Sequence, residues 1–426
     1  MKKYSILLFF ATISILGTAM TSFSLGLWIL NSSQTTFVYA LISFLTVLPP
    51  ILLGPFIGGF IDRFDKRKII IYGQLLAGFF SIVLMTLYHL DFIKVWHVLL
   101  ITFLNSIVNG FIGKAFYVST VVLVPKEKIS KAKGLEETSI ALTTILVPII
   151  VPLIYNLIGL EAVFVIDILT FSVSIIGFLT IKYGLDTATK KKFTVRNDFK
   201  EVKDFFTSKK GMAEILVFYS VISFFLGGLG ILITPMVLGF SDEIGLSITM
   251  ILAGIGSFLG GGLMSFFKGF MYPMKSILNL LMIVSFILVL FLFIPISITS
   301  VSILCCLFMF FSSIMMICDH TFWQNTVPYD LQGRVSGYKG LIIGIWVPVS
   351  FLITSVLIDY VLIPVADQIP LNRNYYPGTD RTYVILILFS LIGGLVFVFT
   401  GFIKRKKIFK QIDLLYIKKL KHPADS

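Results

Sequence analysis

The sequence predicts an all-helical protein that crosses a membrane about a dozen times, and three observations lead to this prediction. Of the 426 residues, 57% are hydrophobic and only 13% are charged, against about 45–50% and about 25% in a soluble domain. The apolar residues form long runs, and the charged residues gather between those runs. This composition excludes a disordered chain, a disulfide-rich scaffold and an ordinary soluble enzyme.

Twelve apolar stretches are long enough, at about 20 residues each, to cross a bilayer as helices. In chain order they cover residues 4–30, 36–61, 69–88, 95–115, 137–157, 161–183, 213–238, 246–267, 276–295, 298–318, 338–363 and 383–403. The first stretch follows Lys2 and Lys3 and so resembles a signal peptide, but it extends well past the about 7–15 apolar residues of such a peptide. We therefore expect it to be the first membrane-spanning helix.

Polar segments set the boundaries of the later stretches. Basic loops at 62–68 and 114–133 separate spans in the first half, and the long basic segment 184–212 separates the sixth span from the seventh. The loop at 364–382, rich in Pro, Asn, Tyr and Asp, precedes the last span. Each of these segments is too polar to lie in the hydrocarbon core.

The basic segment at mid-chain divides the spans into two sets of six. We expect an N-terminal six-helix bundle at 1–183, a cytoplasmic basic linker at 184–212, a C-terminal six-helix bundle at 213–403 and a basic cytoplasmic tail at 404–426. Gly58 and Gly261 are separated by the same number of residues as Pro125 and Pro328, and both pairs lie at equivalent places in the two halves. This shared spacing predicts two pseudo-symmetric six-helix bundles, related by an axis along the membrane normal.

The basic residues also predict an orientation. All but three of the 35 Lys and Arg residues fall on the side of the membrane that holds both termini, and the exceptions are Lys94, Arg373 and Arg381. By the positive-inside rule that side is the cytoplasm. The net charge of +13 is therefore a property of membrane-proximal loops, and the expected partner is the lipid bilayer and not a nucleic acid.

No residue pattern predicts a metal site, a cofactor or a catalytic group. The three cysteines lie in apolar segments, and the four histidines lack the spacing of metal ligands. The glycine-rich run from Gly254 to Gly262 lacks the preceding strand that a dinucleotide-binding loop requires, so we interpret it as a site of close helix packing. We predict no metal, no cofactor and no enzymatic activity.

The loop between the second and third spans carries the most specific motif. It contains Gly58, Asp62, Arg63, Lys66 and Arg67 in that order. This arrangement resembles the signature loop of the major facilitator superfamily, in which a glycine precedes Asp-Arg, a second glycine and two basic residues. The resemblance implies the major facilitator fold, in which two six-helix bundles rock against each other.

The resemblance also implies a role for this loop. A glycine such as Gly58 lets two helices approach closely, and Asp62 at a helix end can accept hydrogen bonds from a neighbouring helix or pair with an arginine. The five motif residues are expected to latch the two halves together on the cytoplasmic side. Asp65 replaces the second glycine of the family, and Asp tolerates a left-handed turn better than most residues do.

Three further segments narrow the resemblance to macrolide-efflux-type exporters within that superfamily. They are residues 124–137 before the fifth span, the stretch around Asp167 in the sixth span, and residues 327–335 before the eleventh. The resemblance implies export of amphiphilic small molecules, such as antibiotics, from a bacterial cytoplasm by proton antiport with alternating access. It also implies a plasma-membrane protein that functions as a monomer.

Ionisable residues in or near the spans are the candidates for proton coupling, because each costs about 2.5–3.5 kcal/mol on insertion scales. Asp167 lies in an apolar part of the sixth span, where it either binds and releases a proton or accepts a hydrogen bond from a neighbouring helix. Glu137 begins the fifth span, where it can instead complement the helix dipole. Asp319 closes the tenth span beside His320, either as part of a proton relay or facing a loop.

The substrate cavity is expected to involve spans one, four, seven and ten. Its candidate residues are weakly polar or aromatic side chains of these spans, and each has ordinary helix packing as the alternative. They are Thr21, Ser24, Trp28, Asn105, Asn109, Tyr219, Ser223, Ser312 and Met316. An uncharged wall of this kind suits a bulky amphiphilic solute better than a compact anion.

Three other functions fit the same architecture. The chain could be a dedicated exporter of one endogenous metabolite, such as a siderophore or peptide antibiotic. It could be a lipid flippase, or a membrane scaffold that transports nothing. The direction of transport rests on the resemblance alone, because nothing in the physical chemistry of the residues distinguishes export from import.

Overall fold

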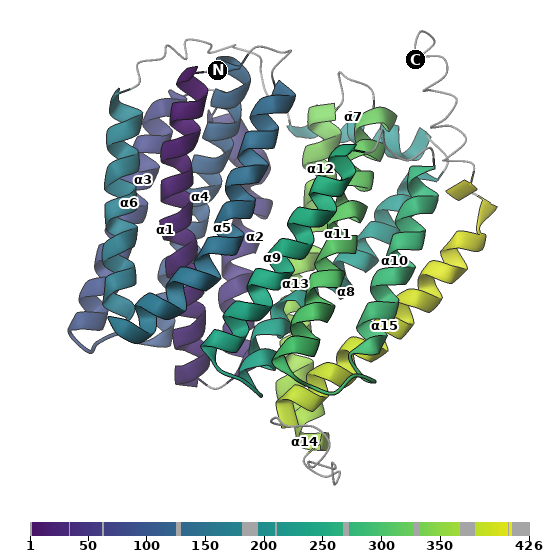
Figure 1. Ribbon diagram of the computed structural model, residues 1–426. Coiled ribbons are helices and arrows are strands. Elements are labelled where there is room, and N and C mark those ends of the chain that lie inside the picture. The colour runs from purple at the N-terminus through teal and green to yellow at the C-terminus, as the bar shows by residue number, and fades with distance from the viewer. Residues whose placement is uncertain are drawn as a thin grey trace. The chain divides into compact units, whose positions relative to one another are not determined.

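The structure of the chain is a computed structural model that describes residues 2–33, 35–61, 64–124, 129–180, 195–208, 211–266, 272–327, 332–366, 380–407 and 409–410. All regular secondary structure in these residues is helical, which confirms the predicted fold class. The chain forms two compact units, residues 1–194 and residues 195–426, whose helices are drawn in Figure 1.

Each unit is built from long helices. The first contains α1 (Lys2–Ser33), α2 (Thr36–Ile61), α3 (Lys66–His89), α4 (Val95–Leu123), α5 (Ile129–Leu157) and α6 (Leu160–Thr180). The second contains α7 (Val195–Ser208), α8 (Met212–Leu238), α9 (Glu243–Phe266), α10 (Pro273–Leu290), α11 (Ile298–Thr326), α12 (Gln332–Gly344), α13 (Trp346–Val356), the π-helical η3 (Leu357–Leu362), α14 (Ile363–Ala366) and α15 (Asp380–Arg405).

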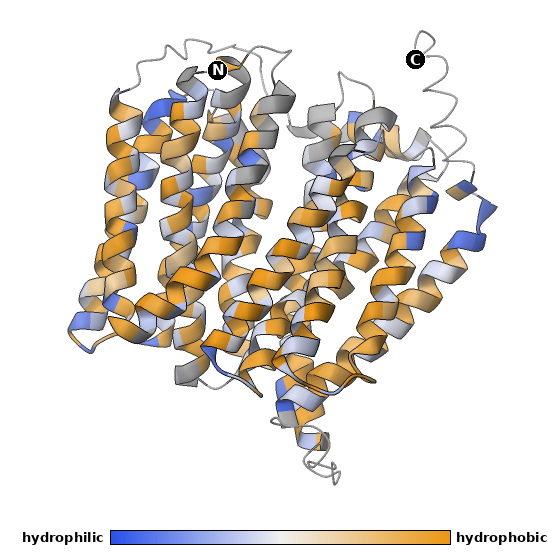
Figure 2. Cartoon of the chain, viewed as in Figure 1, coloured by the Kyte–Doolittle hydropathy of each residue, from blue (hydrophilic) through white to orange (hydrophobic). Residues whose placement is uncertain are grey.

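Eleven helical segments of the described residues are long and apolar enough to cross a membrane, and apolar residues dominate the helices of both units (Figure 2). The fifth predicted span differs from the rest: it lies in α5, whose apolar stretch is the shorter Leu142–Tyr155, because the start of this helix carries charged residues. The 29 residues of α5, at about 1.5 Å each, still exceed the about 30 Å hydrocarbon core. The chain is a multi-pass membrane protein.

The segment expected to be only a basic linker contains a helix. α7 is amphipathic and belongs to the second unit. Val202, Phe205 and Phe206 are buried on one of its faces, whereas Glu201 and Lys203 are exposed. The linker therefore supplies apolar side chains to the packing of the second unit.

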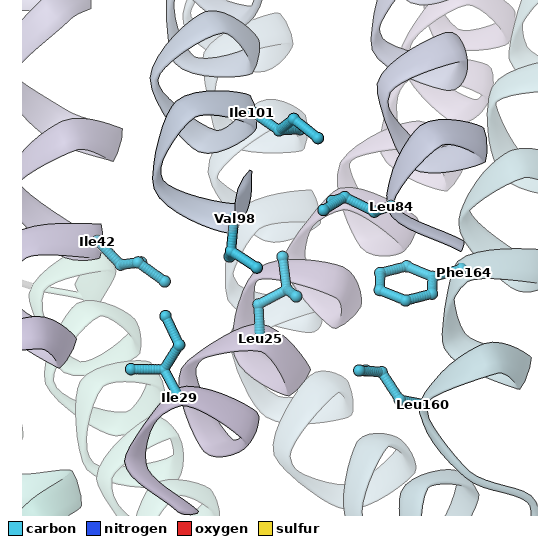
Figure 3. Close-up of a cluster of buried hydrophobic side chains, with 8 residues drawn as sticks. All are labelled: Leu25, Ile29, Ile42, Leu84, Val98, Ile101, Leu160 and Phe164. Carbon is cyan, nitrogen blue, oxygen red and sulfur yellow. The ribbon is translucent and has the colours of Figure 1, made fainter. Parts of the chain in front are cut away.

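Five helices of the first unit meet at a buried apolar cluster (Figure 3). Its members come from the C-terminal part of α1, the start of α2, the end of α3 and the starts of α4 and α6. They are Leu25, Ile29, Ile42, Leu84, Val98, Ile101, Leu160 and Phe164. This cluster fixes α6 against α1 and α3, and so sets the position of the residues that follow Phe164 along α6.

Glycines allow α9 and α11 of the second unit to pack with their backbones in contact. Gly256 and Gly260 lie one turn apart on α9, and a Cβ atom at either would collide with the backbone carbonyl of Cys306 or Phe310 on α11. Close helix packing in the glycine-rich run is thus confirmed at these two positions. In lipid, where burial of apolar surface drives association weakly, such close backbone approach is a main source of helix affinity.

We expect Gly256→Ala to destabilise the protein, because the carbonyl of Cys306 cannot move aside without shifting α11. Overpacking of this kind costs about 1–3 kcal/mol. Gly262→Ala is the matched control on the same helix, since a Cβ atom there has no neighbour within 4 Å among the described residues. Thermal unfolding of the detergent-solubilised chain compares the two variants, and equal unfolding midpoints would contradict the packing role of Gly256.

Candidate functional site

A buried carboxylate lies inside the first unit, where α6 packs against α1 and α3. Asp167 of α6 is 1% exposed, and its Oδ2 accepts a hydrogen bond of 2.7 Å from the Ser81 hydroxyl of α3. The Thr21 hydroxyl of α1 lies beside the same carboxylate. Within the described residues its polar neighbours are hydroxyls, with no basic side chain paired to it. The sequence placed Asp167 in a span, and the structure adds the neighbours that hold it.

The backbone of α1 leaves room for this carboxylate. A Cβ atom on Gly17 would come within 2.8 Å of Asp167 Oδ1 and would collide with the Thr170 hydroxyl. Glycine at this position therefore lets α1 lie directly against the polar part of α6. Motion of α1 relative to α6 would change the surroundings of the carboxylate.

Two further buried polar side chains lie on the same packed helix faces as Asp167 and Ser81. Gln74 lies two turns before Ser81 on α3, and Ser174 lies two turns after Asp167 on α6. The Gln74 Oε1 and Ser174 Oγ atoms are buried without a hydrogen bond to any described residue. Residues seven apart share a helix face, so the buried polar groups run along the packed faces of α3 and α6.

Arg67 of the signature loop joins two helices within the first unit. The Arg67 side chain donates hydrogen bonds from Nε to the Phe178 carbonyl, at 2.9 Å, and from Nη2 to the Leu179 carbonyl, at 2.6 Å. These are carbonyls of the last turn of α6, which a cation satisfies and stabilises. Arg67 thus ties the start of α3 to the end of α6.

Asp65 has a capping role in place of a glycine turn. Its backbone is extended, with φ −63° and ψ 114°, and its side chain accepts a hydrogen bond of 2.9 Å from the Arg67 backbone N–H. A carboxylate at this position satisfies a free N–H group and complements the helix dipole. No left-handed turn is present at Asp65, because the helix starts there.

The other motif residues are placed only in part. Gly58 lies in α2 and Lys66 is buried at the start of α3, whereas Asp62 and Arg63 lie outside the described residues. The side chain of Glu137, in α5, also lies outside them. The latch role and the role of Glu137 remain predictions.

A second carboxylate forms an ion pair inside the second unit. Asp319 Oδ2 of α11 lies 2.7 Å from Lys339 Nζ of α12, and the two side chains are only 17% and 18% exposed. α11 continues to Thr326, beyond residue 318, at which the tenth span is expected to end, so Asp319 lies within the helix. Sequence reasoning missed Lys339 as a site residue, because a lysine at the start of an apolar run is typical of a membrane-proximal loop.

Aromatic side chains surround this ion pair. Lys339 Nζ lies 4.6 Å from the centre of the Trp323 ring and 5.6 Å from the centre of the Tyr219 ring. Phe206 of α7 meets Trp323 edge to face, with ring centres 6.0 Å apart. α7, α8, α11 and α12 therefore contribute to one polar and aromatic cluster.

The residues of the first unit that were expected to line the substrate cavity do not lie together at one site. Thr21 and Ser24 are buried in the packed interior, and Trp28 packs against the apolar cluster of Figure 3. Asn109 Nδ2 donates to Asn105 Oδ1 at 3.4 Å, so these two amides share a face of α4 as expected.

The cavity candidates of the second unit also differ in exposure. Tyr219 belongs to the cluster around Asp319. Ser223 is half-buried, and Ser312 has a buried Oγ atom without a hydrogen bond to a described residue. Met316 is 56% exposed. The described residues contain no group of His, Cys, Asp and Glu side chains that could hold a metal ion.

Known proteins resemble this chain in sequence and in fold. The sequence profile of the Major Facilitator Superfamily matches residues 7–351. Macrolide efflux protein A of Streptococcus pyogenes is 22% identical over 358 residues, which cover 82% of this chain and 87% of that protein. Macrolide efflux protein A of Enterococcus faecalis is 30% identical over 141 residues, 33% of this chain and 43% of that protein.

A solved structure has the same fold. A bacterial homolog of the human lysosomal transporter Spinster, in an inward-facing and unoccupied conformation, superposes with a TM-score of 0.69 at 12% identity, covering 98% of this chain and 97% of that one. The profile match covers most of the chain, and eleven helical segments of the described residues are long and apolar enough to cross a membrane. The protein is a membrane transporter of small molecules and not an enzyme, and it belongs to the Major Facilitator Superfamily.

Proposed function

We propose that the chain exports amphiphilic small molecules from a bacterial cytoplasm by proton antiport, with alternating access between the two membrane sides. The observation that carries this proposal is the buried carboxylate of Asp167 in a membrane-spanning helix, which accepts a hydrogen bond from Ser81 and has the Thr21 hydroxyl beside it. The likeness to proteins named for macrolide efflux supports the direction and the substrate class.

The surroundings of Asp167 suit reversible protonation. A charged carboxylate in a membrane interior is costly, whereas a protonated one is neutral. The Ser81 hydroxyl can donate to the charged form, and a hydroxyl can equally accept from the protonated form. A proton can therefore bind without leaving another charge unpaired. The alternative is that Asp167 serves only to hold α6 against α3.

The contacts of Asp167 with α1 support a link between protonation and helix movement. Asp167 lies against Gly17 and Thr21 of α1, and the first helix of this fold is expected to line the substrate path. A change of charge on Asp167 alters how closely α1 can pack against α6. This link between the proton and α1 is the proposed route of coupling.

Within this proposal the signature loop has two tasks. Arg67 acts as the anchor between α3 and α6, so the latch between the halves falls to Asp62, Arg63 and Lys66, with Gly58 allowing close approach. The distribution of basic residues supports cytoplasmic termini in a bacterial plasma membrane. One chain with two bundles forms a complete transport unit, which supports function as a monomer.

Efflux of a fluorescent amphiphile from energised cells tests the function itself. We expect cells that contain the chain to lose the dye faster than cells with an empty vector, and a protonophore to remove the difference. Efflux that a protonophore leaves unchanged would exclude proton antiport. An absence of efflux for a panel of antibiotics and dyes would favour a dedicated metabolite exporter or a lipid flippase.

Asp167→Asn tests the coupling. The amide keeps the size of the side chain but cannot bind and release a proton, so we expect proton-driven accumulation of the dye in everted vesicles to be abolished. Downhill exchange of the dye should persist. Accumulation at the wild-type rate would show that Asp167 is structural and would leave Glu137 or Asp319 as the coupling acid.

Ser81→Ala is the matched control for Asp167→Asn. It removes the hydrogen bond that joins α3 to α6 but keeps the carboxylate. The loss of a hydrogen bond to a charged group costs about 1.5–3 kcal/mol, so the unfolding midpoint should fall while coupled accumulation is retained. A loss of coupling equal to that of Asp167→Asn would contradict the separate role of the carboxylate.

Arg67→Gln tests the anchor at the start of α3. The variant loses two charge-assisted hydrogen bonds to the end of α6, and we expect the chain to be destabilised by about 1–3 kcal/mol. Lys68→Gln removes a neighbouring exposed charge and should leave the unfolding midpoint unchanged. If Arg67→Gln impairs transport without lowering stability, Arg67 belongs to the latch instead.

A further inference from the structure

The cluster around Asp319 has the composition of a binding site for an organic cation. One carboxylate, Asp319, and two aromatic rings, Tyr219 and Trp323, face one ammonium group, that of Lys339. A carboxylate combined with aromatic faces is how proteins recognise quaternary and protonated amines. In this chain the Lys339 ammonium group occupies the place of such an amine beside Asp319 and the two rings.

We propose that Asp319, Tyr219 and Trp323 form a substrate site for the amine of a cationic amphiphile, which Lys339 occupies until the substrate displaces it. This inference rests on the proposed transport function and names the substrate class: molecules with one protonated or quaternary amine on a bulky apolar body. Lys339 then acts as a tethered competitor of the substrate.

Unused polar atoms at the same place support a ligand larger than one ammonium group. The Asp319 Oδ1 and Trp323 Nε1 atoms are buried, and neither forms a hydrogen bond to a described residue. The buried Tyr219 hydroxyl faces the Asp319 carboxylate. Trp323 as a whole is 7% exposed. Buried polar atoms are nearly always hydrogen-bonded in proteins, so an unused carboxylate oxygen and an unused indole N–H at one ion pair point to a group that binds there.

The exchange of one cation for another keeps the charge balanced. Removing a partner from a buried ion pair is strongly destabilising, because it leaves an uncompensated charge. An incoming amine replaces Lys339 beside Asp319, so the carboxylate stays paired throughout. A neutral or anionic ligand that displaced Lys339 would leave the buried Asp319 carboxylate without a positively charged partner. The site is therefore selective for cations.

Lys339 is able to leave. Its side chain is 18% exposed, and lysine carries its charge on a flexible four-carbon stem that can extend towards water. The apolar part of an amphiphile can contact the rings that the ammonium vacates. Phe206, which packs on Trp323, extends the aromatic surface towards α7.

Binding of two dyes to the purified chain in detergent tests the proposal. Rhodamine 6G is a cationic amphiphile and Nile red is a neutral one, and fluorescence anisotropy measures both affinities. We expect Lys339→Met to tighten rhodamine 6G binding about tenfold, equivalent to about 1.4 kcal/mol, because the internal competitor is gone. Adding Asp319→Asn to Lys339→Met should weaken rhodamine 6G binding below that of the wild type. Neither change should alter Nile red binding.

A matched lysine controls for the loss of positive charge. Lys404, in the same unit, bonds to the neutral amide of Asn279 at 2.5 Å, so Lys404→Met should leave both affinities unchanged. Weaker or unchanged rhodamine 6G binding in Lys339→Met would overturn the proposal. So would an equal change in Nile red affinity.

A second measurement uses the wild-type chain and does not depend on a variant folding. Acetylation of lysines by a water-soluble ester, read by mass spectrometry, reports whether Lys339 faces water. Rhodamine 6G should increase acetylation of Lys339 but not of Lys404, and Nile red should change neither. Unchanged or reduced acetylation of Lys339 would contradict displacement. Both measurements need no proton gradient, so their failure is distinguishable from a failure of proton-driven efflux.

Discussion

A carboxylate inside a membrane-spanning helix must be matched by a hydrogen-bond donor or a cation, and this requirement organises the polar contacts of both units. In the first unit Asp167 is matched by the Ser81 hydroxyl at 2.7 Å. In the second unit Asp319 is matched by the Lys339 ammonium at the same distance. In each case the partner lies on another helix, so the interaction that stabilises the carboxylate also joins two helices. The apolar contacts between the same two helices must then form at the helix separation that the polar contact requires.

The close approach of helices follows from the same requirement. Polar side chains are short here, so their helices must pack tightly for the hydrogen bonds to form. Gly17 provides the space on α1 that Asp167 and Thr170 occupy. At the end of α6, Arg67 reaches across from α3 and satisfies two carbonyls that the helix itself cannot. The polar contacts at the middle and at the end of α6 thus fix one helix in two places.

The sequence was sufficient to predict the fold class and nearly all of the spans, because a run of about 20 apolar residues has few stable alternatives in a membrane. The sequence also indicated that Asp167 lies within a span, since it is an acid in an otherwise apolar run, and the structure shows that its side chain is buried. The sequence did not predict the partners of the two carboxylates. Ser81 is one of many serines, and only the packing of α3 on α6 brings it to Asp167. Lys339, at the start of the expected span 338–363, could not be paired with Asp319 from the sequence, because hydropathy does not show how α11 and α12 pack.

The two carboxylates are not interchangeable, and the difference lies in their partners. A proton on Asp167 leaves hydroxyl groups behind, which serve as donors or acceptors without change of charge. A proton on Asp319 would instead leave the Lys339 ammonium without its counterion in a place where both side chains are largely buried. Asp167 is therefore suited to gaining and losing a proton, whereas Asp319 is suited to exchanging one cation for another. Under the two proposals, the carboxylate that binds the coupling proton and the carboxylate that selects the substrate belong to different halves of the chain, because a hydroxyl partner tolerates a change of charge and an ammonium partner does not.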